Sequence, residues 1–181
     1  MGRSILAGLD LGPVSHDLPL GLSVRHMIER DLRAVSEIHQ AASPWGWSRT
    51  RIRDFLRSRG GYGLVAESCG AVVGFALITM RRPTQEIREF VVDSEYRGLG
   101  VGSALMAKLA TRLGSSWEAI RFDVRETDLP CQLFLQSHGF LARRVLRGHF
   151  PDSGEDAFEM VLTSDRARLA RPGFLGRGGG V

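Results

Sequence analysis

The chain has 181 residues, of which 43% are hydrophobic and 24% are charged, a composition that suits one soluble domain with its own hydrophobic core. No apolar run approaches the roughly 18 residues of a membrane span, and the N-terminus lacks the basic and apolar segments of a secretion signal, so we expect a cytoplasmic protein with no membrane partner. The net charge of +4 comes almost entirely from arginine, because Lys108 is the only lysine, and several arginines lie near the C-terminus, so we expect no dedicated nucleic-acid binding.

The ends of the chain differ from its middle. Residues 1–21 show no sustained periodicity, and residues 164–181 contain Pro172-Gly173 and a glycine triplet, which do not favour a helix or a strand. We expect a flexible N-terminal leader at 1–21, a single domain at 22–163 and a flexible, basic, glycine-rich tail at 164–181.

The first predicted elements of the domain are a strand and two helices. A strand at 22–27 precedes a helix from Asp31, whose apolar positions fall on one face. Ser48 is a suitable N-cap for a second helix, which Gly60-Gly61 ends.

Strands and helices then alternate. Strands are expected at 63–67, 71–79 and 86–93, followed by a helix that begins at Gly100 and keeps its apolar stripe to Leu113. The remaining elements are a strand at 119–124, a helix at 128–137 and strands at 140–146 and 157–162. The order β-α-α-β-β-β-α-β-α-β-β predicts an α/β domain with a mixed sheet.

The most informative segment is Arg97-Gly98-Leu99-Gly100-Val101-Gly102, between a predicted strand and a predicted helix. Its glycines allow successive backbone N–H groups to converge on a phosphate at the positive end of the helix dipole. No Gly-Lys-Ser/Thr follows, which excludes a Walker-type loop, and the position in mid-chain excludes a dinucleotide fingerprint. The segment therefore predicts a site for a polyanion other than a Mg-nucleotide.

This segment resembles the central motif of the GNAT family, Arg/Gln-x-x-Gly-x-Gly/Ala after a strand that ends in Val. The resemblance implies acetyl-CoA as the ligand, with a strand edge that pairs with the pantetheine arm and a loop that cradles the pyrophosphate. It also implies a single GNAT-like domain, with a mixed, mostly antiparallel sheet flanked by helices and strands that splay around the CoA site. The residues implied to bind CoA here are Phe90, Val91, Val92, Arg97, Gly98, Leu99, Gly100, Val101, Gly102 and Ser103.

A second likeness to the family covers residues 128–140 and adds Asp128, Phe134 and Leu135 to the implied CoA set. Asp128 stands in the place of an Asn, Cys131 in the place of an Ala, and Leu135 in the place of a tyrosine that often protonates the leaving thiolate. Within the family, residues 44–48, 123–125, 147–151 and 155–160 are similar to ribosomal-protein N-terminal acetyltransferases. Trp45, Trp47 and Phe150 are candidates to line the acceptor pocket.

Three side chains are candidates for the base that deprotonates the amine. Asp123 lies on the strand after the glycine-rich helix, where the similar subfamily has a glutamate. Glu86 has the same strand parity as Phe90 and Val92, which predicts that it faces the same site. His149 is the third candidate, because an imidazole can accept a proton and the similar subfamily has an aromatic residue there that meets the substrate. No metal site is expected, because Cys69 and Cys131 lie far apart without a CxxC spacing.

The sequence thus predicts an N-acetyltransferase that transfers acetyl from acetyl-CoA to a primary amine by direct attack in a ternary complex, as a monomer or a homodimer. The subfamily resemblance implies a protein N-terminal α-amine as the acceptor, whereas a small-molecule amine is equally compatible with the fold. A regulatory module that binds acyl-CoA without catalysis is the third alternative, suggested by Leu135 and by the short side chain of Asp123.

Overall fold

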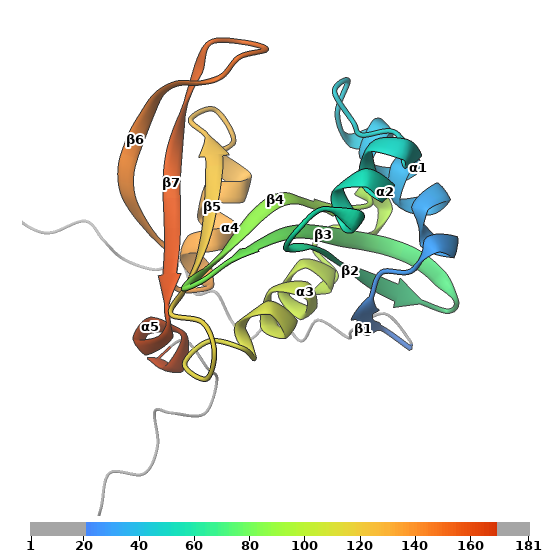
Figure 1. Cartoon of the computed structure of the whole chain (residues 1–181), viewed down its shortest axis with the longest axis horizontal. Helices are drawn as coiled ribbons and strands as arrows, with labels where there is room; N and C mark the ends of the chain where they lie inside the picture. Colours follow the sequence, from blue (N-terminus) through green and yellow to red (C-terminus); the bar gives the residue numbers. More distant parts are fainter. Residues whose placement is uncertain (1–20, 170–181) are drawn as a thin grey trace, which may run out of the picture.

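A seven-stranded sheet runs through residues 21–169, the part of the chain that the computed structural model describes (Figure 1). The strand order is β1-β2-β3-β4-β5-β7-β6, and all neighbours are antiparallel except β4 and β5. This confirms the predicted mixed, mostly antiparallel sheet. The strands are β1 (Ser23–His26), β2 (Gly61–Ser68), β3 (Ala71–Arg81), β4 (Thr84–Val92), β5 (Ala119–Arg125), β6 (Leu141–Phe150) and β7 (Glu155–Thr163).

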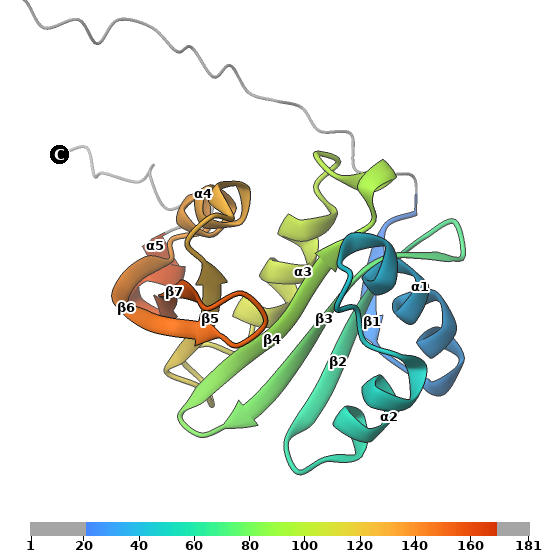
Figure 2. The same ribbon diagram turned by 90° about the horizontal axis from the view of Figure 1, so that it is seen from above.

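Helices cover the sheet on both faces (Figure 2). On one face, α1 and α2 enclose a core with Val65, Phe75 and Leu77 of β2 and β3. On the other face, α3 and α4 enclose a larger core that reaches β5 and β7. The helices are α1 (Leu32–Ala42), α2 (Arg49–Arg57), α3 (Val101–Ala110), α4 (Leu129–Ser137) and α5 (Ser164–Leu169), and two short 3-10 turns are η1 (Glu29–Asp31) and η2 (Ser94–Tyr96).

Local chemistry accounts for two of the helix starts. The Ser48 hydroxyl accepts a hydrogen bond from the Arg51 N–H, which confirms the predicted N-cap of α2. Asp128 caps α4 in the same way by accepting from the Cys131 N–H, and Pro130 occupies the first turn, where its missing N–H has no cost.

Three predicted boundaries were wrong by three or more residues. Helix α3 ends at Ala110, short of Leu113, because the chain turns at Gly114 and Leu113 forms a β-bridge with Trp117. Strand β6 continues past residue 146 to Phe150, with an irregularity in its pairing after Leu146. Residues 164–169, assigned to the flexible tail, form α5; the leader at 1–20 and the tail from 170 lie outside the described residues.

The feature that positions the site is a separation of β4 from β5. The two strands pair only as far as Ile87 and Phe122, although β4 continues to Val92 and β5 to Arg125. At the same point, Leu77 and Ile78 of β3 pair with Glu89 and Ile87, so that β4 carries one extra residue. Such a bulge bends a strand away from its neighbour, which accounts for the predicted splay.

None of the helices within residues 21–169 combines the length and the apolar composition that a membrane crossing requires.

Candidate active site

A cavity of about 1100 Å³ occupies the space between the separated ends of β4 and β5. Its walls also include the glycine-rich loop before α3, the first turns of α4, the loop between α1 and α2, and the loop between β6 and β7. The structure brings most of the predicted site residues to this one cavity: Trp45, Trp47, Phe90, Val91, Val92, Arg97, Gly98, Gly100, Gly102, Ser103, Asp123, Asp128, Phe134 and Phe150.

The glycine-rich loop leads into α3 through a left-handed turn. Gly98 and Gly100 have φ angles of +75° and +79°, which residues with a side chain rarely adopt. Gly100 is the N-cap residue of α3 and has no side chain to occupy the first N–H groups of the helix. The Arg97 Nε donates to the Val92 carbonyl oxygen at 3.2 Å, so this arginine holds the loop against the end of β4.

Gly102 makes room for an aromatic pair. A Cβ atom at this position would lie 3.2 Å from Cε2 and Cζ of Phe134, whose ring centroid is 5.7 Å from that of Phe90. His138 holds α4 beside α3, because its Nε2 lies 3.1 Å from the Ser103 hydroxyl while its Nδ1 lies 2.8 Å from the Phe134 carbonyl oxygen. Packing between the two helices therefore leaves little room for a side chain at the third glycine of the motif.

Three residues of the predicted CoA set do not line the cavity. Leu135 is fully buried in the core beneath α4, and its neighbour Phe134 is the residue that faces the cavity, because successive residues of a helix point about 100° apart. Val101 is buried in the same core, and Leu99 is exposed outside the cavity.

Asp123 lies where β4 and β5 separate, and only 12% of its side chain is exposed. Its Oδ2 is 3.4 Å from His149 Nε2, whereas its Oδ1 is buried without a hydrogen-bond partner among the described residues. Burial raises the pKa of this carboxyl above its usual range, against the opposing effect of Arg121. Asp123 is therefore a stronger base than an ordinary aspartate.

Glu86 does not reach the cavity, so the prediction from strand parity was wrong. Ile87 and Phe90 both contact the core beneath α3, because the bulge in β4 reverses the alternation between them. Glu86 consequently points to the face of the sheet away from α3, at a level where β4 and β5 are still paired. There it accepts hydrogen bonds from Arg121 and Arg88, each at 2.8 Å, and Arg121 helps hold the pKa of Glu86 below its usual range although burial opposes the shift.

The end of the cavity away from α3 is lined by aromatic residues. Trp47 is stacked by the Arg51 guanidinium at 4.1 Å from the ring centroid, and Trp45 is 66% exposed at the rim. Across the cavity, Arg125 lies 3.9 Å over the Phe150 ring and also forms an ion pair with Asp152 at 2.6 Å. Arg125 thus fixes the β6–β7 loop as a wall of the cavity.

Sequence reasoning missed several residues of the cavity wall. Arg125 is part of the subfamily resemblance at 123–125 but was not predicted to line the site. Its partners, Asp152 and Glu155, lie about 30 positions later in the chain. His39 lies on the wall with its Nε2 3.1 Å from Glu89, and its Nδ1 accepts a hydrogen bond from the Trp47 N–H. No local motif marks either pair. Arg125 meets its partners only when β5 pairs with β7, and His39 meets Glu89 only when α1 packs on the sheet.

Within residues 21–169 there is no group of three or more His, Cys, Asp and Glu side chains placed to hold a metal ion. Cys131 forms no disulfide bond within these residues.

Comparisons with known proteins agree with the geometry. The sequence profile of the Acetyltransferase (GNAT) family matches residues 32–140. An uncharacterised N-acetyltransferase of Methanocaldococcus jannaschii is 30% identical over 147 residues, which are 80% of this chain and 94% of that protein. A candidate ribosomal protein bS18-alanine N-acetyltransferase of Bacillus subtilis is 26% identical over 144 residues, 78% of this chain and 95% of that protein.

Among solved structures, the fold is similar to that of Ard1 from Thermoplasma volcanium. The TM-score is 0.71 at 26% identity, over 80% of this chain and 98% of that one.

Proposed function

The chain belongs to the GNAT family of acetyltransferases, and on this premise we propose that it acetylates the N-terminal α-amine of a protein, with acetyl-CoA as the donor. The family uses acetyl-CoA as its acetyl donor, and the chain is an N-acetyltransferase of this type. The observation that carries the proposal is the position of Asp123, a largely buried carboxylate of raised pKa on the wall of the cavity that the glycine-rich loop also lines.

The residues present fit acetyl-CoA. The backbone N–H groups at the start of α3 donate to no capping side chain, because the N-cap residue is the left-handed Gly100, and free N–H donors at a helix start suit a pyrophosphate. The unpaired edge of β4 from Phe90 to Val92 suits an extended chain of amides, because it offers the hydrogen-bonding groups that β5 leaves free. When bound there, acetyl-CoA supplies an activated thioester carbonyl.

Asp123 and His149 fit the removal of a proton from the attacking amine. The amine nitrogen forms a bond to the thioester carbonyl carbon, and the proton lost by nitrogen passes to the Asp123–His149 pair. The bond from the carbonyl carbon to sulfur breaks, and CoA leaves as a thiolate that takes a proton from water, because Leu135 cannot donate one. The imidazole lies next to the carboxylate and is partly exposed, so that it can carry the proton onward to solvent.

Direct transfer is favoured over an acyl-enzyme with Cys131. This thiol lines the cavity, but burial raises its pKa to about 12. At neutral pH it is therefore a neutral thiol and a poor nucleophile, since the thiolate is the reactive form. A ternary complex is the route that the cavity supports.

A protein N-terminus is supported by two considerations. An α-amine has a pKa near ~8, so a single carboxylate of raised pKa is a sufficient base, whereas a lysine amine near ~10.4 needs more assistance. The Bacillus subtilis relative is named for acetylation of an alanine of a ribosomal protein, and the aromatic end of the cavity is open to a peptide.

The test is thiol release from acetyl-CoA with a panel of peptides that have free N-termini, for the wild type, Asp123→Asn and Glu86→Gln. We expect Asp123→Asn to slow acetylation roughly 100-fold at neutral pH, in the lower range for loss of a general base. The loss should shrink above pH ~8, where an α-amine is already neutral. Glu86→Gln is the comparison, since it removes a second carboxylate that also contacts Arg121 but does not line the cavity, and we expect a smaller loss.

Each other outcome contradicts a specific part of the proposal. Turnover with small amines and none with peptides would identify a small-molecule enzyme. Binding of acetyl-CoA without turnover on any acceptor would identify a regulatory module. Equal and pH-independent losses in both variants would show that Asp123 positions the substrate and does not act as the base.

A further inference from the structure

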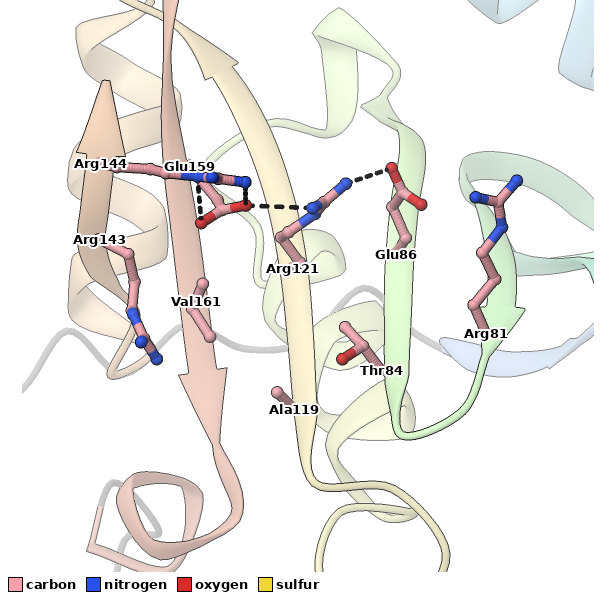
Figure 3. A pocket seen from close by; sticks show the side chains of 9 residues that line it. All are labelled: Arg81, Thr84, Glu86, Ala119, Arg121, Arg143, Arg144, Glu159 and Val161. Carbon is pink, nitrogen blue, oxygen red and sulfur yellow. Dashed lines mark hydrogen bonds and ion pairs between the residues drawn. The ribbon is translucent and has the colours of Figure 1, made fainter. Parts of the chain in front are cut away.

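A second cavity, of about 570 Å³, lies on the face of the sheet that α1 and α2 leave uncovered (Figure 3). Its walls come from β3, β4, β5, β7 and β6, and its charged residues are Arg81, Glu86, Arg121, Arg143, Arg144 and Glu159. We call it the arginine pocket. Four arginines and two glutamates leave it with an excess of positive charge.

The two glutamates already have partners, and two of the arginines do not. Arg121 donates to Glu86 at 2.8 Å and to Glu159 at 3.1 Å, and Arg144 donates to Glu159 at 3.0 Å. Within residues 21–169, Arg81 and Arg143 form no hydrogen bond or ion pair with another side chain. Their guanidinium groups are therefore available to an anion from outside, and their planar donor arrays match a carboxylate.

A local irregularity of β6 brings Arg143 to the pocket. Ala142 pairs with Met160 and Arg144 with Glu159, so Arg143 is an extra residue between two consecutive pairs. In a regular strand, Arg143 and Arg144 would point to opposite faces. The bulge places both side chains on the open face, as Figure 3 shows, and so concentrates positive charge at one rim of the pocket.

The arginine pocket adjoins the candidate base. The Arg121 Nε lies 3.8 Å from Asp123 Oδ1, and Glu159 is the cross-strand partner of Asp123. From Asp123 the pocket extends along β5 to Ala119, four residues away, which is roughly 13 Å in an extended strand. A peptide bound with its amine at Asp123 can therefore place its second to fourth residues over the pocket.

We propose that the arginine pocket selects acceptors with acidic side chains directly after the N-terminal residue, with Arg81 and Arg143 as the groups that bind them. This inference rests on the proposed function, because it assumes that a protein N-terminus enters at Asp123. Arg121 and Arg144 set the floor of the pocket through their ion pairs, and Arg81 and Arg143 determine the preference for negative charge.

The test compares two peptides that share a free N-terminus and differ by Glu or Gln at the second, third and fourth residues. For the wild type, we expect kcat/KM to be about tenfold higher with the Glu peptide, through a lower KM. The double variant Arg81→Gln/Arg143→Gln should bring the Glu-to-Gln ratio close to one. Arg30→Gln is the matched control, since this exposed arginine of η1 lies outside both cavities, and it should keep the wild-type ratio.

Failure of this inference can be told apart from failure of the proposed function. Equal acetylation of both peptides by the wild type, or a preference that survives in the double variant, overturns the acidic selection while the proposed function stands. If neither peptide is acetylated, calorimetry in the presence of CoA decides: tighter binding of the Glu peptide that the double variant loses supports the pocket, and equal or absent binding overturns it. An oligonucleotide that inhibits the wild type and not the double variant, together with equal kcat/KM for the two peptides, would assign the pocket to phosphate and overturn the proposal.

Discussion

The two cavities, which adjoin where Asp123 of one contacts Arg121 of the other, are built in different ways. In the cavity between β4 and β5, the end proposed to bind acetyl-CoA is formed by main chain: the end of β4, the glycine-rich loop and the first turn of α3. Two aromatic rings pack beside this main chain. The arginine pocket takes its character from side chains of five strands, and the residues that line it extend from Arg81 to Val161. The first is a site made by backbone geometry, and the second is a site made by charge.

This difference predicts how each cavity responds to substitution. A main-chain site loses its ligand when a side chain occupies the space, because the surrounding backbone is closely packed and cannot move aside. A site of exposed charged side chains weakens by degrees, because water and salt share the interaction. The predictions below test that contrast, from the largest expected effect to the smallest.

Gly102→Val should abolish binding of acetyl-CoA, with a loss of affinity of about 100-fold or more. The added atoms meet the Phe134 ring, which a Cβ alone would approach to 3.2 Å, and overpacking of this kind forces neighbouring groups to move. Isothermal calorimetry with acetyl-CoA measures the loss. Ala107→Val is the control, because it introduces the same β-branched residue at an exposed position of the same helix and should bind normally.

A second variant separates packing from phosphate contact. If the Phe134 ring is the obstacle, Gly102→Val/Phe134→Ala should recover part of the affinity, since the smaller side chain frees the space. An absence of recovery in a folded double variant would show that Gly102 is required for close approach to the ligand itself.

Arg125→Lys should raise the KM for the acceptor by about fivefold to tenfold and leave the affinity for acetyl-CoA unchanged. Lysine keeps the charge but loses the planar group that stacks on Phe150 and pairs with Asp152, so the β6–β7 loop is held less firmly. Steady-state kinetics with peptide and calorimetry with acetyl-CoA give the two values. Arg147→Lys is the control, because it lies on the same hairpin, pairs with Asp156 and lines neither cavity.

A changed affinity for acetyl-CoA in Arg125→Lys would show that the β6–β7 loop contributes to the acetyl-CoA end of the cavity. An unchanged KM would show that the loop does not contact the acceptor.

The same contrast explains what could be predicted from the sequence. The order of strands and helices and the glycine-rich loop were predictable, because periodicity and turn residues act over a few neighbouring positions. The mixed sheet followed from the order of elements, the mostly antiparallel pairing and the splay followed from the family resemblance, and all three were confirmed. Most of the aromatic and glycine residues of the predicted site line one cavity, and their role in binding stays a prediction.

The errors came from irregularities and from distant contacts. A bulge in β4 changes the face of Glu86, and nothing in the residues around Arg88 indicates an extra position. Leu135 was matched to a family position, whereas the packing of α4 makes Phe134 the residue of the cavity. The arginine pocket joins residues from strands far apart in the sequence, so no window of the chain contains its pattern.

The smallest expected effect is on stability, and here Asp123 and Glu86 should differ in sign. Burial raises the pKa of Asp123 in the folded protein, so the folded state holds more protons than the unfolded state between the unfolded pKa, near ~3.9, and the raised value. Stability from this group therefore falls as pH rises through that window and stays lower above it. Asparagine does not titrate, so Asp123→Asn should gain Tm relative to the wild type on going from acid to neutral pH.

Glu86 gives the opposite sign, because Arg121 is foremost among the groups that hold its pKa below the usual range. Its ionised form contributes stability above the unfolded pKa, near ~4.3, and this contribution is lost as pH falls through the folded pKa. Glu86→Gln should therefore lose Tm relative to the wild type at neutral pH, and the difference should close in acid. Scanning calorimetry of the wild type and both variants across this pH range measures the two slopes. Slopes of the same sign would mean that the two carboxylates share one electrostatic environment, and the distinction between the cavity that uses Asp123 and the pocket that neutralises Glu86 would fail.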